Sequence, residues 1–401
     1  MNVTTILKRG VAPLAAGLLV VFVISDAMRA QSSALTVTLT GQSMLRSDLR
    51  ETAPAAVQTI ASLVKGADVV FTNFEGAIAQ PGQPNDSAPR QGPGFLAPPG
   101  AMDALKAMGF NLIDTSNNHS ADLKVPGILN TIREADRVGL PHAGTGKTLE
   151  DATAPAILKT PHGTVALVAM ASGLVSNGSA ATETQPGVNE LRVGPGNVPN
   201  ADDSARILNS IRRAASQADF VMVYEHNHVF DKPFGLIFTE ALPDRVRPAP
   251  WLTKWVHAEI DAGADLIVMH GAPLLHGVEI YKGKPIFYDL GNFIFNAPLT
   301  MWTLQEPMTW ESVVPTVEFH GHQLQSITMR PIVMNFIGQG QPEAHDPYAG
   351  NTFIYTRGLP APAKGDQATY ILQRVADLSQ PFGTKIDVKA DRADVQVRSG
   401  T

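Results

Sequence analysis

The sequence Asn111-Leu112-Ile113-Asp114-Thr115-Ser116-Asn117-Asn118-His119 joins an apolar run to a group of small polar side chains. The apolar residues and the abrupt change after them predict a buried strand that ends in a loop at a functional site. Asn118 offers an amide oxygen and His119 an imidazole nitrogen, so the pair suits a divalent cation and a nearby oxyanion. A polar loop that only caps the next helix is the alternative interpretation.

Two earlier segments end in a similar way. Residues 35–41 alternate apolar and polar side chains and predict a strand, which is followed by Gln42 where many hydrolases carry a carboxylate. Residues 67–74 form a nearly continuous apolar run that leads into Glu75. Strand ends line the ligand crevice of open α/β sheets, so Glu75 is a candidate metal ligand, with a capping or surface role as the alternative.

Two later apolar runs end in histidine. Residues 218–225 lead into His226 and His228, and two residues of separation in a strand place both rings on the same face. Residues 264–269 lead into His270, so a third apolar run leads to a histidine. Imidazole nitrogens are common metal ligands, whereas histidines satisfied within the core are the alternative interpretation.

The rest of the chain alternates predicted strands and helices, as expected of an α/β fold. We expect helices near residues 53–65, 101–108, 125–138, 201–215, 251–262 and 368–378, hairpins within 156–170 and 278–288, a buried strand with Asp289 and Asn292, two strands within 316–334, and a last strand near 385–388. Asn292 is a possible weak ligand or substrate contact, like Gln42. The Pro- and Gly-containing stretch at 358–365 suggests a main domain over 35–335 and a C-terminal extension over 336–401 that packs on or beside it.

The overall composition limits the function. The 401 residues are 44% hydrophobic and 17% charged, with a net charge of -6 and no cysteine. Disulfides and thiolate metal sites are therefore excluded, and any metal must use oxygen and nitrogen ligands. The absence of clustered Lys and Arg also argues against nucleic acid as a partner.

The first 30 residues form a separate segment. Lys8 and Arg9 precede an apolar run over residues 11–24, and small residues including Ala27 and Ala30 follow it. This pattern predicts a secretory signal peptide, with a membrane anchor formed by residues 11–24 as the alternative. We therefore expect an exported protein of the periplasm or cell envelope.

The series of strand ends resembles one known family. The motifs are Gly41-Gln42, Asn73-Phe74-Glu75, Asn117-Asn118-His119, His226, His270-Gly271 and the stretch 277–295, whose sequence is GVEIYKGKPIFYDLGNFIF. In this order they are similar to the CapA family of capsule, or poly-gamma-glutamate, synthesis proteins. The resemblance implies a metallophosphoesterase-like α/β/β/α sandwich of two mixed sheets flanked by helices. It covers roughly residues 35–300.

The same resemblance implies a metal site. It maps metal ligands or metal-proximal groups to Glu75, Asn118, His119, His226 and His270, and we add His228 from its spacing. The family usually has Gly-Asp at the first strand end and a second His after the one matched by His270, whereas this chain has Gln42 and a displaced His276. We therefore expect a divalent cation, Mn, Zn or Fe, in a one-metal centre or no metal at all, rather than a two-metal centre.

The implied function is metal-dependent hydrolysis, with His119 as the proton donor to the leaving group. The substrate expected from the family is a γ-glutamyl amide polymer, while the wider fold favours phosphate esters. Capsule-assembly membrane proteins are possible partners. The alternative is a non-catalytic envelope protein that binds or guides an anionic capsule polymer, which the neutral side chain of Gln42 favours.

Overall fold

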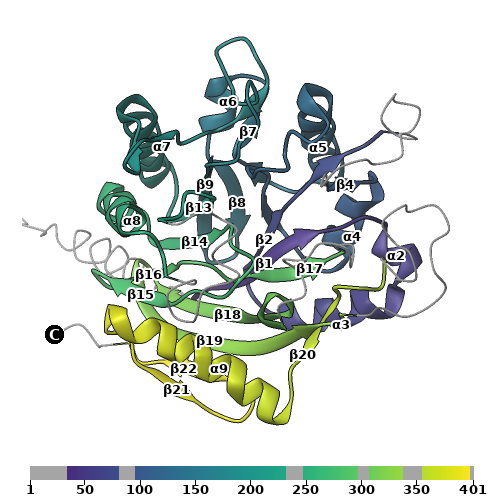
Figure 1. The fold of residues 1–401 in the computed structure, drawn as a ribbon, viewed down its shortest axis with the longest axis vertical. Coiled ribbons are helices and arrows are strands. Elements are labelled where there is room, and N and C mark those ends of the chain that lie inside the picture. Colours follow the sequence, from purple (N-terminus) through teal and green to yellow (C-terminus); the bar gives the residue numbers. More distant parts are fainter. Residues whose placement is uncertain (1–33, 81–94, 232–246, 297–306, 337–354, 398–401) are drawn as a thin grey trace, which may run out of the picture.

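The computed structural model describes residues 34–80, 95–231, 247–296, 307–336 and 355–397. Within these ranges, two β-sheets pack face to face and helices cover their outer faces (Figure 1). The N-terminal segment predicted to direct export lies outside the described residues, as does most of the predicted loop at 80–100.

The first sheet contains ten strands in the order β21-β22-β19-β18-β1-β2-β5-β6, with β17 also paired to β1 and β20 to β19. Their bounds are β1 (Leu35–Met44), β2 (Val69–Phe74), β5 (Leu112–Asp114), β6 (His142–Ala143), β17 (Asn292–Phe295), β18 (Glu311–His320), β19 (Gln323–Met334), β20 (Pro360–Pro362), β21 (Ile386–Val388) and β22 (Ala393–Val395). Strands β1, β2, β5, β6 and β17 run parallel, and β18 and β19 form an antiparallel hairpin.

The second sheet has the order β15-β16-β14-β13-β9-β8. Its strands are β8 (Ala156–Thr160), β9 (Gly163–Ser172), β13 (Phe220–Asn227), β14 (Leu266–His270), β15 (Val278–Tyr281) and β16 (Lys284–Phe287). The central strands β9, β13, β14 and β16 are parallel, while β8 and β15 pair antiparallel at the two edges. Short pairs lie outside both sheets: β3 (Ala77–Ile78) with β4 (Leu96–Ala97), β7 (Thr145–Gly146) with β10 (Gly187–Val188), and β11 (Val193–Gly194) with β12 (Val198–Pro199).

The helices are distributed over the outer faces. Their bounds are α2 (Leu49–Thr52), α3 (Pro54–Val64), α4 (Gly100–Ala107), α5 (Lys124–Val138), α6 (Leu149–Thr153), α7 (Ala201–Gln217), α8 (Pro250–Ala262) and α9 (Gly365–Ser379), with 3₁₀ helices η4 (Pro307–Trp310) and η5 (Gln380–Phe382). Helices α2 to α5 pack on the outer face of the first sheet, and α7 and α8 on that of the second (Figure 1). The predicted α/β/β/α sandwich is therefore confirmed.

The apolar runs of the sequence are explained by burial on both faces of each sheet. On β9, alternate residues such as Leu167 enter the core between the sheets, while their neighbours, such as Val168, face α7 and α8. Strands covered on both faces lose the apolar–polar alternation of a half-exposed strand. In the inter-sheet core, Phe71 of β2 and Tyr224 of β13 place their ring centroids 5.5 Å apart.

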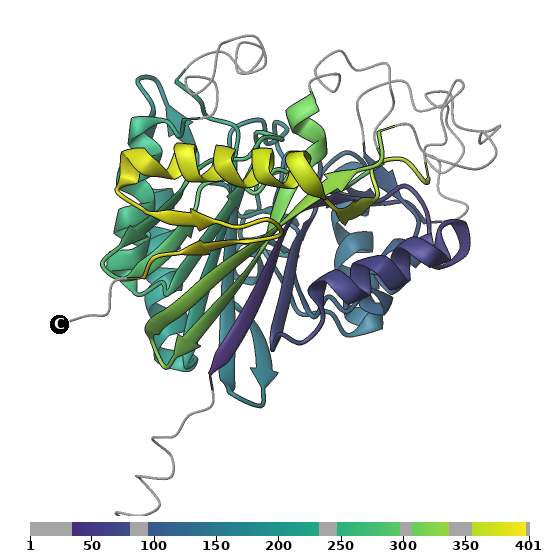
Figure 2. The same cartoon turned by 90° about the horizontal axis from the view of Figure 1, so that it is seen from below.

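The C-terminal part of the described chain continues the first sheet. Strand β20 pairs with β19, and the hairpin β21–β22 extends the sheet beyond β19. Helix α9 lies beside this hairpin at the lower flank of the two sheets in Figure 1, and Figure 2 shows the helix and both strands from below. Ile371, Leu372 and Val375 of α9 belong to the inter-sheet core. That residues 336–401 form a separate C-terminal extension stays a prediction.

Phe71→Ala should lower the free energy of unfolding by about 3–5 kcal/mol, because the side chain is fully buried between the sheets and its removal leaves a cavity. Urea denaturation followed by circular dichroism measures the change. Ile157→Ala on β8, at a side chain that is 39% exposed, is the control and should cost less than about 1 kcal/mol. Equal effects of the two variants would contradict the assigned core.

Candidate active site

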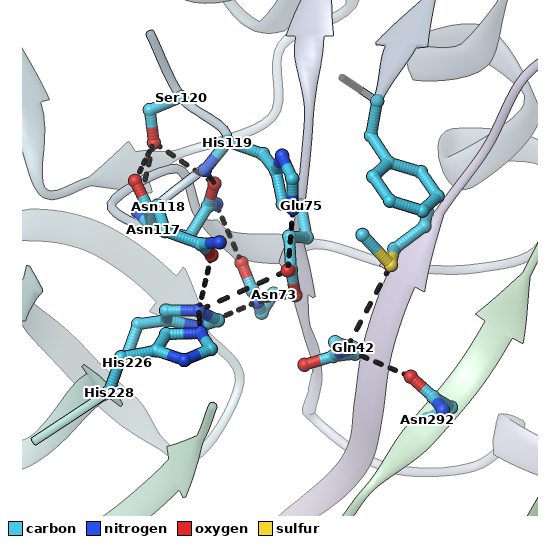
Figure 3. Close-up of polar contacts among 12 residues, drawn as sticks. Gln42, Asn73, Glu75, Asn117, Asn118, His119, Ser120, His226, His228 and Asn292 are labelled. Atoms are coloured by element: carbon cyan, nitrogen blue, oxygen red, sulfur yellow. Dashed lines mark hydrogen bonds and ion pairs between the residues drawn. The ribbon is translucent and has the colours of Figure 1, made fainter. Parts of the chain in front are cut away.

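Parallel pairing brings the strand ends that were predicted from the sequence to one region of the structure. Strands β1, β2 and β5 run side by side in the same direction, as do β13 and β14, and His226 and His270 are register partners. Because residues paired in adjacent parallel strands point to the same face, both rings leave their sheet on one side. Polar side chains from the two sheets meet there (Figure 3).

Asn117 organises the loop that follows β5. Its side-chain amide donates to the carbonyl of Phe74 at 2.9 Å and to Asn73 Oδ1 at 3.1 Å. Its Oδ1 accepts the backbone N–H of His119 at 3.1 Å. Ser120 Oγ closes the turn by donating to the carbonyl of Thr115 at 2.6 Å. The loop is therefore fixed to the end of β2, and the side chains of Asn118 and His119 are directed into the site.

Asn118, His226 and His228 converge on one point. Asn118 Oδ1 lies 2.8 Å from His226 Nε2, and His228 Nε2 lies 3.1 Å from the same nitrogen. His226 is fully buried, and its other ring nitrogen, Nδ1, lies 3.1 Å from the hydroxyl of Tyr224. Tyr224 therefore helps to fix the orientation of the imidazole from behind. Burial, followed by the charges of the other histidines, lowers the pKa of His226 well below its ordinary value.

Glu75 borders this group. Its Oε1 lies 4.0 Å from His226 Nε2 and 3.9 Å from His119 Nε2, and its Oε2 accepts the amide of Asn73 at 3.3 Å. Burial raises the pKa of Glu75 to about 7, although the charge of His119 opposes the shift. The carboxyl group is thus poised to carry or release a proton near neutral pH.

His119 forms a hydrogen-bonded pair with Asp122 that favours the protonated ring. Its Nδ1 lies 2.8 Å from Asp122 Oδ2, and that oxygen also accepts the backbone N–H of Phe95 at 2.6 Å. Burial acts to lower the pKa of His119, but the hydrogen bond and charge of Asp122 and the charge of Glu75 raise it above the ordinary value. With Nδ1 held by Asp122, Nε2 is the atom that faces the rest of the site.

His270 lies beside these groups and takes no part in their contacts. Both of its ring nitrogens are buried without a hydrogen-bond partner among the described residues, and its ring lies 5.4 Å from that of Tyr224. His276 is also buried, with neither ring nitrogen bonded within the described chain, and both histidines line one small enclosed cavity. Burial lowers the pKa of each to about 3, so both rings are neutral at physiological pH.

Gln42 occupies the first strand end as the sequence indicates. Its Nε2 donates to Asn292 Oδ1 at 2.8 Å, and Asn292 in turn donates to the carbonyl of Thr309 at 2.8 Å. The buried Oε1 of Gln42 has no hydrogen-bond partner among the described residues, and this oxygen end points toward the side of His226 (Figure 3). Asn292 is fully buried, and its Oδ1 accepts from Gln42, so in this arrangement it positions the Gln42 side chain.

These donors could serve one divalent cation at most. Among the described residues, no three His, Asp or Glu side chains form a group that could hold a metal ion. The convergent atoms are two imidazole nitrogens and an amide oxygen, and Asn118 Oδ1 and His228 Nε2 lie 2.8 and 3.1 Å from His226 Nε2. Two tetrahedral ligands of one Zn²⁺ ion at bonds of about 2.1 Å lie about 3.4 Å apart, so these atoms would have to separate slightly to hold an ion between them. A second ion has no carboxylate at the position of Gln42.

The structure thus brings together most of the predicted site residues: Glu75, Asn118, His119, His226 and His228. His270 and Gln42 border them, and Asn292 lies behind Gln42. Asp122 and the supporting roles of Asn73 and Tyr224 were not predicted from the sequence. The i, i+3 spacing of His119 and Asp122 was a usable signal, because residues three apart in a helical turn are neighbours.

Two sheets packed face to face, with polar groups gathered at the ends of parallel strands, define a metallophosphoesterase-like α/β protein. The family model for "Bacterial capsule synthesis protein PGA_cap" matches residues 36–297. The chain therefore belongs to this family of bacterial capsule synthesis proteins, and the predicted membership is confirmed.

The chain is similar to several known proteins. The chain is 29% identical over 421 residues to the uncharacterized protein y4sH of Sinorhizobium fredii, covering 82% of this chain and 86% of that protein. It is 28% identical over 244 residues to the PGA biosynthesis protein CapA of Bacillus subtilis, covering 61% of this chain and 57% of the other. A solved structure of a hypothetical protein from Thermus thermophilus aligns with a TM-score of 0.42 at 12% identity, over 74% of this chain and 98% of that one.

Within the described ranges, no helix is both long enough and apolar enough to cross a membrane.

Asp122→Asn should lower the pKa of His119, because it removes the negative charge and the acceptor that favour the protonated ring. The pKa can be measured by NMR titration of the histidine carbon-bound protons in protein stripped of metal with a chelator. Asp136→Asn is the control, since Asp136 is exposed and contacts His142 at 3.3 Å instead. An unchanged His119 titration in Asp122→Asn would show that the pair does not hold the proton.

Proposed function

We propose that this protein is an exported, metal-dependent hydrolase of capsule or poly-gamma-glutamate metabolism. The observation that carries the proposal is the convergence of Asn118 Oδ1, His226 Nε2 and His228 Nε2, with the hydrogen-bonded His119–Asp122 pair beside them. Cation ligands and a proton donor in one place are the two components of metal-assisted hydrolysis.

His119 acts as the proton donor to the leaving group. Asp122 holds Nδ1 and stabilises the charged ring, so the proton available for transfer is the one on Nε2. Glu75 Oε1, 3.9 Å from that nitrogen, adds negative charge that also favours protonation. After transfer, the neutral ring regains a proton from solvent, because the side chain of His119 is 16% exposed.

A divalent ion, Mn, Zn or Fe, would be held by Asn118, His226 and His228, with Glu75 at the margin. Such an ion supplies a water of lowered pKa and polarises the scissile bond. Tyr224 and Asn73 keep the His226 ring in place through Nδ1, at 3.1 and 3.4 Å. Gln42 Oε1 and the His270 nitrogens are buried, ligand-capable atoms near the site that are without hydrogen-bond partners in the described chain.

The proposed substrate is an envelope amide or phosphate ester. The names of the relatives, PGA biosynthesis protein CapA and capsule biosynthesis protein CapA, favour the γ-glutamyl amide of a polymer. The basic and apolar pattern of residues 8–24 supports export to the periplasm or cell envelope, where capsule-assembly membrane proteins are the expected partners.

A non-catalytic role is the second candidate. Gln42 is neutral and anchored to Asn292, so the first strand end contributes no negative charge to a metal site. A protein of this kind would bind or guide an anionic capsule polymer without cleaving it. The two candidates differ in metal content and in turnover.

The purified mature domain should contain close to one equivalent of divalent metal per chain and should hydrolyse poly-gamma-glutamate or a generic phosphodiester. Elemental analysis by mass spectrometry measures the metal, and chromatography of the products measures cleavage. Protein that is free of metal and remains inert after addition of Mn²⁺ or Zn²⁺ would reject the hydrolase and leave the polymer-binding role.

His119→Ala should lower turnover at least about 100-fold while leaving the metal bound, since the ring donates a proton and is not among the convergent ligands. Steady-state kinetics and metal analysis of the same preparation test both parts. His320→Ala, at the exposed last residue of β18, should leave both values unchanged. Full turnover by His119→Ala would remove this residue from the acid role.

His226→Ala should weaken metal binding at least about 100-fold, because it removes the buried nitrogen shared by the Asn118 and His228 contacts. Competition with a chromophoric chelator gives the dissociation constant. His322→Ala is the control, since that ring is exposed on the β18–β19 turn and contacts Asp265. Metal affinity equal to that of the unmodified protein would place the ion elsewhere.

A further inference from the structure

Arg46 is a buried cation close to His119. It follows β1 four residues after Gln42, and only 5% of the residue is exposed. Its backbone N–H donates to Asn296 Oδ1 at 3.2 Å, and its Nε donates to the carbonyl of Asn296 at 2.8 Å. The guanidinium group is thereby fixed to the end of β17, next to the end of its own strand.

Phe95 connects this cation with the proton donor. The guanidinium carbon of Arg46 lies 4.9 Å from the centre of the Phe95 ring, and the His119 ring meets the same ring edge-on, with centroids 4.9 Å apart. The backbone of Phe95 also donates to Asp122, the partner of His119. Arg46 is near enough that its positive charge acts on the imidazole against those of Asp122 and Glu75.

Arg46 adds positive charge just beyond the strand whose end carries the neutral Gln42. In two-metal hydrolases a pair of cations neutralises the charge of the reacting group. Here the proposed donor set would serve one cation at most, and the same strand that carries the neutral Gln42 continues into a fixed arginine. A planar guanidinium binds carboxylates and phosphates through paired hydrogen bonds, which an ammonium group cannot match.

We propose that Arg46 binds an oxyanion of the substrate next to the scissile bond, so that the site selects substrates with a carboxylate or phosphate at that position. This inference rests on the proposed hydrolase function and names the chemistry that the site recognises. In a γ-glutamyl amide the oxyanion is the α-carboxylate of the same residue. In a phosphate ester it is the phosphate itself.

The binding test uses the metal-loaded full mature chain and two probes, inorganic phosphate and glutarate, in NMR titrations. Arg46→Gln should weaken binding of the preferred probe at least tenfold, and Arg46→Lys at least threefold, because lysine keeps the charge and loses the fork. Arg50→Gln, at an exposed arginine paired with Asp48 near the same strand end, should stay within twofold. The probe whose affinity falls in the Arg46 variants shows whether the site recognises a carboxylate or a phosphate.

Arg46→Gln can fail to fold because its partner Asn296 is buried, so circular dichroism and thermal unfolding accompany each titration. In that case Arg46→Lys decides the outcome. Affinities within twofold of the unmodified protein for both probes in every folded variant would overturn the proposal.

Kinetics separate this proposal from the hydrolase function. Unmodified protein should cleave γ-glutamyl-p-nitroanilide with a lower KM than its α-amide analogue. Arg46→Gln should reduce the ratio of the KM for the α-amide to the KM for the γ-amide at least fivefold. A purely structural arginine would change both substrates equally, which would overturn the assignment. Probe binding that depends on Arg46 without any turnover would reject the hydrolase while supporting Arg46 as the anion contact.

Discussion

The contact between Asn118 Oδ1 and His226 Nε2, 2.8 Å long, joins the two sheets at the site, and everything proposed for the protein depends on it. Asn118 belongs to the loop after β5 in the first sheet, whereas His226 lies at the end of β13 in the second. The contact exists because the inter-sheet core, including Phe71 against Tyr224, fixes the distance between the sheets. Tyr224 serves both layers, since its ring packs in the core and its hydroxyl holds His226.

The stretch 277–295 links the same two sheets through the backbone. It begins in the hairpin β15–β16 of the second sheet and ends in β17, which pairs in parallel with β1 of the first. The crossing brings Gly291 so close to Gly41 that a Cβ on Gly41 would lie 2.4 Å from the Gly291 carbonyl oxygen. A side chain larger than hydrogen would separate β1 from β17 and displace both Gln42 and Asn292, so this stretch combines fold and site in one segment.

The order of strands and helices could be predicted because burial on both faces leaves long apolar runs, and because the positions of Glu75, His119, His226 and His270 all follow such runs. Contacts between distant residues could not. Gln42 meets Asn292 250 positions further along, and no local pattern specifies that pairing. Strand β22, only three residues long with one polar residue in the middle, was missed because its pairing with β19 is determined by the tertiary fold.

In the proposed hydrolase, the charges around His119 would let a site with few metal ligands accept an anionic substrate. Asp122 and Glu75 favour the protonated ring, but the same negative charges repel an approaching carboxylate or phosphate. A cation held at Asn118, His226 and His228 would offset this repulsion on one side of His119, and Arg46, placed across Phe95, would offset it on the other. The carboxylates would thus favour the charged form of the proton donor, while the two positive groups would keep those carboxylates from excluding the substrate.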